Sequence, residues 1–151
     1  MSVTPASDVA RALWALRAYD TTALATVSAG GPHVAGVFFA PELTEHGMQL
    51  LIATIAGSRK QREMVDDPRV AFMCSPGNPS RWVQGSGRAE VIFDEALQPA
   101  LYERLIAHAA GARPFVERLS TYPAIIMVET LKVVEEAGKP SLLLRFDGSA
   151  Q

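Results

Sequence analysis

The sequence is poor in cysteine and in long apolar runs, and it has no strong excess of one charge. Cys74 is the only cysteine, so an intrachain disulfide is excluded and a zinc site has no cysteine pair to build on. No apolar run approaches the roughly 20 residues of a membrane-spanning helix. The net charge of −2 gives no overall attraction to nucleic acid or to an anionic membrane. We therefore expect a cytoplasmic protein that binds neither, in which any anion site is local.

The length and the apolar content suit a domain that folds on its own core. The 151 residues are 48% hydrophobic, and a chain of this size buries roughly two thirds of its extended surface. Neither an internal repeat nor a linker is visible in the sequence. We expect a single domain over residues 1–151 that needs no structural metal.

The pattern along the chain predicts strands separated by short helices. An amphipathic N-terminal helix is expected over about residues 7–18, where Leu13, Trp14 and Leu16 recur at helical spacing. Shorter helices are expected at 59–65 and 94–108, with the regular part of the second beginning near Pro99, and in a piece ending near Ser120. Seven runs read as strands, at residues 21–28, 33–40, 48–55, 69–74, 81–93, 124–134 and 141–146, with a polar loop at 42–47.

Hairpin spacing and the scarcity of long helices decide the fold class. Parallel strands would need a full crossover helix between each pair, which the spacing does not allow. We therefore predict a mainly β fold, a small antiparallel barrel over about residues 21–146. Gly85 and Gly87 predict a bulge or a close backbone neighbour in the strand that contains them.

The sharpest local feature is the run Gly57-Ser58-Arg59-Lys60-Gln61-Arg62, where three cations fall in the first turn of a short helix. Cations are disfavoured at a helix N-terminus by several tenths of a kcal/mol each unless an anion is bound there. Backbone N–H groups, the Ser58 hydroxyl and the cations could converge on a phosphate. A solvated basic face explains the spacing about as well, and both readings stay open.

The other candidate residues give weaker evidence of a ligand site. Trp82 and Gln84 share one face of a strand and could contact a flat ligand, although packing is the default. Thr54 lies just before the basic turn, but a threonine in a strand is commonplace. The three histidines, His33, His46 and His108, lack metal-ligand spacing, and no serine lies in a nucleophile elbow, so we predict no metal site.

The order of elements resembles the pyridoxamine 5′-phosphate oxidase-like family of flavin-binding split β-barrels. The resemblance covers about residues 18–134, through the segments ALATVSAGGPHVAGVFF, LLIATIAGSRKQREMVDDPRVAFM and RWVQGSGRAEVI. It implies an FMN phosphate site at Thr54, Ser58, Arg59 and Lys60. It also implies a homodimer that holds the cofactor at the subunit interface.

The resemblance assigns the remaining cofactor contacts as well. Backbone from Val37, Phe38 and Phe39 would border the flavin ring, and Trp82 and Gln84 would reach it from the partner's strand. The expected function is a flavin-dependent oxidoreductase acting on a small molecule. The alternatives are a deazaflavin-dependent reductase and a non-catalytic carrier or sensor of flavin or haem.

The sequence also departs from the namesake oxidase. Ala35 and Ala40 stand where that enzyme has an arginine and a lysine on its second strand, and its C-terminal basic motif is not visible around residues 142–148. These departures predict that the chain is not a true pyridoxamine phosphate oxidase. No residue stands out as a general acid or base, so the substrate cannot be read from the sequence.

Overall fold

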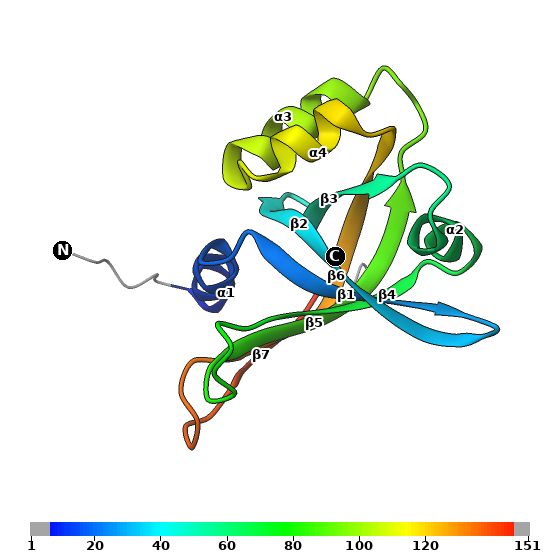
Figure 1. Cartoon of the computed structure of the whole chain (residues 1–151). Coiled ribbons are helices and arrows are strands. Elements are labelled where there is room, and N and C mark those ends of the chain that lie inside the picture. The colour runs from blue at the N-terminus through cyan, green and yellow to red at the C-terminus, as the bar shows by residue number, and fades with distance from the viewer. Residues whose placement is uncertain (1–6, 147–151) are drawn as a thin grey trace.

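The computed structural model describes residues 7–146, so the end of the 142–148 segment lies outside the described residues. Strands dominate, with short helices between them (Figure 1). In chain order the elements are α1 (Asp8–Arg17), β1 (Thr21–Ser28), β2 (Gly31–Thr44), β3 (Gly47–Ile55), α2 (Arg59–Asp66), β4 (Arg69–Cys74), β5 (Trp82–Val91), α3 (Gln98–His108), α4 (Ala112–Arg118), β6 (Thr121–Val134) and β7 (Leu142–Arg145).

The seven strands form one antiparallel sheet that closes on itself. Their order is β3-β2-β1-β4-β5-β6-β7, and β3 also pairs with β6. The long strand β6 makes both connections, because its first half pairs with β3 and its second half pairs with β7. The resulting architecture is a split barrel, which confirms the small antiparallel barrel predicted from the strand spacing and the split form implied by the family resemblance.

The core lies inside the barrel, with a second apolar cluster under α3 and α4. Strand residues alternate between the two faces, so every second side chain of β1 and β4 is buried. Phe39, Leu50 and Ile126 are among the fully buried side chains of the barrel core. Leu101 and Leu105 of α3 pack in the second cluster. None of the helices within residues 7–146 has the length and apolarity to span a bilayer.

Two boundaries differ most from the sequence prediction. Strand β2 continues through Pro41 to Thr44, so the predicted loop at 42–47 is wrong and only a tight turn remains. The extension is stabilised because Glu42 faces Gln49, whose amide donates a hydrogen bond to its carboxylate at 2.9 Å. Strand β6 begins at Thr121, three residues before the predicted start at Ala124, because its first residues pair with the end of β3.

Gly85 and Gly87 of β5 mark the irregularity that the sequence predicted. The β5–β6 register shifts between Ser86 and Gly87. A Cβ at Gly87 would lie 2.1 Å from the carbonyl oxygen of Met127, and one at Gly85 would lie 2.4 Å from the Phe72 ring. Only glycine allows the strands to approach this closely.

Candidate functional site

The basic turn is the N-terminus of α2, and its backbone is held in one conformation. Gly57 adopts φ +75°, a left-handed value that glycine accepts without strain. The Ser58 hydroxyl caps the helix by accepting the N–H of Gln61 at 3.3 Å. The N–H groups of Arg59 and Lys60 have no acceptor among residues 7–146, so both remain available to an anion.

A buried amide supports the turn from below. The Gln61 side chain accepts the Gly57 N–H at 2.9 Å and donates to the Thr54 hydroxyl at 3.0 Å. Thr54 is fully buried and donates to the Tyr122 carbonyl at 3.1 Å. The structure therefore places Thr54 beneath the turn, where its hydroxyl is already engaged and acts on the turn through Gln61.

The three cations of the turn lie in different surroundings. The Arg62 guanidinium donates back to the Gly57 carbonyl, whereas Arg59 is largely exposed and contacts the Glu63 carboxylate loosely at 3.7 Å. Lys60 is partly buried, and no carboxylate among the described residues lies within ion-pair distance of it. Desolvation by this burial lowers the pKa of Lys60. A partly desolvated ammonium without a counter-charge is a favourable place for an anion.

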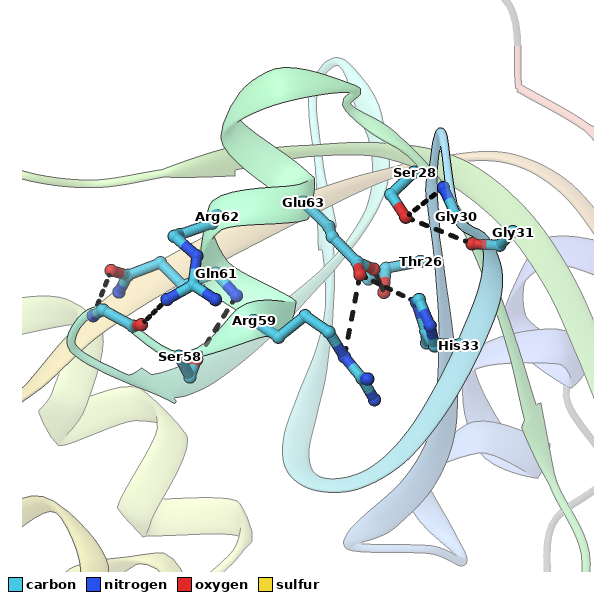
Figure 2. A network of polar contacts seen from close by, with 11 residues as sticks. Thr26, Ser28, Gly30, Gly31, His33, Ser58, Arg59, Gln61, Arg62 and Glu63 are labelled. Atoms are coloured by element: carbon cyan, nitrogen blue, oxygen red, sulfur yellow. Dashed lines mark hydrogen bonds and ion pairs between the residues drawn. The ribbon is translucent and has the colours of Figure 1, made fainter.

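Sequence reasoning missed a cluster of polar side chains behind the turn, formed by Thr26, His33 and Glu63 (Figure 2). Glu63 is only 6% exposed. It accepts the Thr26 hydroxyl at 2.6 Å, and its other oxygen lies 2.7 Å from Nδ1 of His33. The Thr26 hydrogen bond is the main reason that the pKa of Glu63 is lowered, and nearby His33 and Arg59 act in the same direction against the opposing effect of burial.

This cluster fastens α2 to the β1–β2 hairpin. Thr26 and His33 face each other in the β1–β2 register, and Glu63 reaches them from α2. The only signal in the sequence was the spacing of Arg59 and Glu63, four residues apart on one helix face. The hairpin register and the docking of α2 are long-range features that this spacing does not contain.

Trp82 and Gln84 lie at the other end of the sheet from the basic turn. Arg69, which follows α2, pairs with Arg88, while Cys74 at the far end of β4 pairs with Val83. At about 3.3 Å per residue, Trp82, six residues from Arg88 on β5, therefore lies roughly 20 Å from the α2 end. One chain does not bring these two residues to the turn, so their contact with the cofactor stays a prediction about the partner's strand.

The other predicted residues occupy the interior or serve structural contacts. Val37 and Phe39 are buried in the barrel core, and Phe38 lies partly buried against the α3–α4 cluster. His108 contacts the Tyr19 carbonyl at 2.7 Å through Nε2. Burial raises the pKa of the Cys74 thiol to about 11. No three metal-binding side chains gather closely enough within residues 7–146 to hold a metal ion.

The family model of pyridoxamine 5′-phosphate oxidase matches residues 10–137, most of the chain. The chain belongs to this family. Its match includes β1 to β6 and all of α2, and therefore the whole basic turn. No curated protein sequence matches the chain.

Several solved structures share the fold of this chain. A haem-binding protein from Mycobacterium smegmatis is 18% identical with a TM-score of 0.73, over 95% of this chain and 60% of that protein. ChuZ from Campylobacter jejuni is 13% identical with a TM-score of 0.70, over 91% of this chain and 61% of that one. A putative pyridoxamine 5′-phosphate oxidase from Listeria innocua is 17% identical with a TM-score of 0.64, over 82% and 95%. At these identities the likeness shows the fold.

Proposed function

We propose that the basic turn of α2 binds the phosphate of FMN and that the protein is a flavin-dependent oxidoreductase acting on a small molecule. The observation that carries this proposal is Lys60, which is partly buried with no carboxylate partner in the described chain and lies beside two unused backbone N–H groups. A phosphate would supply the missing charge and accept those N–H groups. Membership of the pyridoxamine 5′-phosphate oxidase family supports flavin as its source.

The residues of the turn have distinct parts in this proposal. Lys60 and Arg59 neutralise the phosphate, and the exposed Arg59 guanidinium is free to leave its loose contact with Glu63. Ser58 keeps the first helical turn closed, while Gln61 and Thr54 hold Gly57 in place. Bound FMN would supply the hydride chemistry, and the protein would orient the ring and exclude competing reactions.

A second copy of the chain completes the proposed site. The outer face of the sheet carries exposed apolar side chains that a partner would cover, Val34 at 68%, Met73 at 47% and Leu143 at 70%, with Gln84 and Lys132 between the last two. In this arrangement Trp82 and Gln84 reach the flavin ring of the partner subunit, and the backbone from Val37 to Phe39 borders the ring. A Met73→Glu variant should therefore sediment as a monomer at concentrations where the unmodified protein is a dimer.

The decisive experiment compares FMN with riboflavin, which lacks the phosphate. Changing Arg59 and Lys60 together to Gln should weaken FMN binding by roughly a hundredfold, about tenfold per charge-assisted contact. Riboflavin binding should change little, because its ring and ribityl chain do not touch the turn. Quenching of flavin fluorescence on titration gives both affinities.

A matched control changes Arg17 and Arg118, exposed arginines in the last turns of α1 and α4, to Gln. This control has the same change in net charge and should keep the FMN affinity of the unmodified protein. An equal loss of affinity for FMN and riboflavin in the Arg59/Lys60 variant would contradict the proposal. Absence of FMN binding by the unmodified protein would contradict it as well.

The alternatives differ in what they bind and in whether turnover follows. A deazaflavin-dependent reductase would prefer the deazaflavin coenzyme in the same titration, and a carrier or sensor would bind flavin without NAD(P)H-dependent turnover. A haem carrier is supported by the likeness to the mycobacterial haem-binding protein. A Soret band on adding haem, together with no response to FMN, would favour it. The alanines at positions 35 and 40 argue against true pyridoxamine phosphate oxidation.

A further inference from the structure

A groove of about 400 Å³ lies between α1 and the adjoining ends of β5 and β6. Its volume falls in the range of small-molecule sites, about 300–1,000 Å³. Figure 1 shows α1 and α2 on opposite sides of the barrel, so this groove is far from the basic turn of the same chain. The lining consists of Trp14, Ala15, Ala18, Tyr19, Pro76, Arg81, Trp82, Val83, Val133, Val134 and Glu135; we call it the tryptophan groove.

Aromatic side chains form the walls of the tryptophan groove. Both tryptophans of the chain line it, together with Tyr19. Trp14 is 55% exposed, whereas Ala12 and Leu16 on the other face of the same helix are fully buried. An exposed tryptophan beside a second one is an apolar surface that water solvates poorly. Flat aromatic molecules are the ligands that such walls accept best.

The charges around the groove favour an anion. Glu135 is engaged by the Arg11 guanidinium, so its charge is compensated. Arg81 on the rim is exposed and makes no ion pair with any residue in 7–146. The Lys132 ammonium lies 5.3 Å from the centre of the Trp82 ring, adding a second positive charge nearby. The groove is therefore apolar inside and positive at its edge.

We infer that the tryptophan groove binds a planar aromatic molecule that carries a carboxylate or a similar anionic group. The ring lies between the aromatic walls, and the anionic group pairs with Arg81. Within one chain this site lies apart from the proposed phosphate site, because the β4–β5 ladder lies between the two. The small residues Ala15 and Ala18 leave the room that the ring needs.

The test uses 2-naphthoate as the probe and the neutral 2-naphthamide as its matched analogue. Because both tryptophans line the groove, their emission should change as 2-naphthoate is added to the full chain. Arg81→Gln should weaken naphthoate binding roughly tenfold and leave naphthamide binding unchanged. Trp14→Ala should weaken both ligands several-fold, and its Trp82 still reports binding.

Two controls keep the outcome decisive. Arg118→Gln removes an exposed arginine from α4 and should bind both ligands as the unmodified protein does. Calorimetric titration of both ligands into the unmodified protein gives their affinities without relying on tryptophan emission. Absence of binding at millimolar naphthoate, or equal binding by all variants, overturns the inference. Because Arg81 and Trp14 are exposed, their replacement leaves the core intact, and circular dichroism of each variant verifies this.

Discussion

The two ends of the β4–β5 ladder are built by different physical means. At the α2 end, buried polar groups fix the backbone: Gln61 binds Gly57 and Thr54, and Glu63 binds Thr26. At the other end, apolar side chains of β5 and β6 and the aromatic rings of the tryptophan groove define a shape.

The difference determines how each end tolerates change. A buried polar group that loses its partner is destabilising by about 1–3 kcal/mol, so the α2 end depends on every member of its network. Exposed aromatic walls contribute little to folding, so the tryptophan groove can change without loss of stability. We therefore expect the α2 end to be the more rigid and the more easily damaged of the two.

The largest effect should come from the strand that joins the two ends. Gly87→Ala places a Cβ 2.1 Å from the Met127 carbonyl oxygen, which belongs to the backbone of β6 and cannot rotate away. We expect destabilisation of about 3 kcal/mol and a fall in melting temperature of roughly 10 °C. Thermal unfolding followed by circular dichroism measures it.

Gly36→Ala is the matched control for this prediction. Gly36 also lies in a strand, and a Cβ there would meet nothing within 4 Å. The free energy of unfolding of the Gly36→Ala variant should stay within about 0.5 kcal/mol of that of the unmodified protein. Similar losses in both variants would show that glycine flexibility, and not the close approach of β5 to β6, explains the effect.

A smaller effect, confined to the α2 end, should follow from Gln61→Leu. Leucine is similar in size but leaves the Gly57 N–H and the Thr54 hydroxyl without the amide that binds them. We expect a loss of about 1–2 kcal/mol, with weaker FMN binding and unchanged naphthoate binding. Urea unfolding and the two titrations measure these quantities.

Thr54→Val tests whether these groups act as one unit. The double variant Gln61→Leu/Thr54→Val should lose less stability than the sum of the two single changes, because the hydrogen bond between the two side chains can be lost only once. Strict additivity would contradict the network described for the α2 end. Weaker naphthoate binding in these variants would contradict the independence of the two ends.

The sequence predicted the parts of the molecule that depend on neighbours along the chain. The capped basic turn was readable because Gly57, Ser58, Arg59 and Lys60 are contiguous, and the strand spacing was sufficient to predict the barrel. The extension of β2 was missed because Pro41 reads as a strand end, although its pairing with Leu50 continues the ladder.

Features formed by distant segments were not predictable. Glu63 meets Thr26 and His33 only because α2 docks on the β1–β2 hairpin, and this docking depends on tertiary packing. The tryptophan groove joins α1 to β5, and the apolar spacing of α1 did not indicate that Trp14 stays exposed. In both cases the residues were visible in the sequence and their partners were not.

The smallest expected effect is a pH dependence at the α2 end. Asp67 follows α2 and accepts hydrogen bonds from the Arg69 guanidinium, the shortest at 2.6 Å, and from its backbone N–H at 3.1 Å. These bonds lower the pKa of Asp67 to about 2, below the value of about 3.9 for an unfolded chain. A carboxylate with a depressed folded pKa stabilises the protein above the unfolded value, and this contribution is lost as pH falls from about 4 towards 2.

Asp67→Asn should therefore be less stable than the unmodified protein at pH 7, and the difference should shrink as pH falls through that range. Urea midpoints of both proteins at several pH values measure it, with Asp66→Asn, a neighbouring exposed carboxylate without an ion pair among residues 7–146, as the control. A difference that stays constant with pH would show that Asp67 acts through the shape of its side chain. Both tryptophans lie away from the α2 end. In the folded protein, before the urea transition, their emission should therefore stay native at each pH, because acid weakens the α2 end without opening the groove.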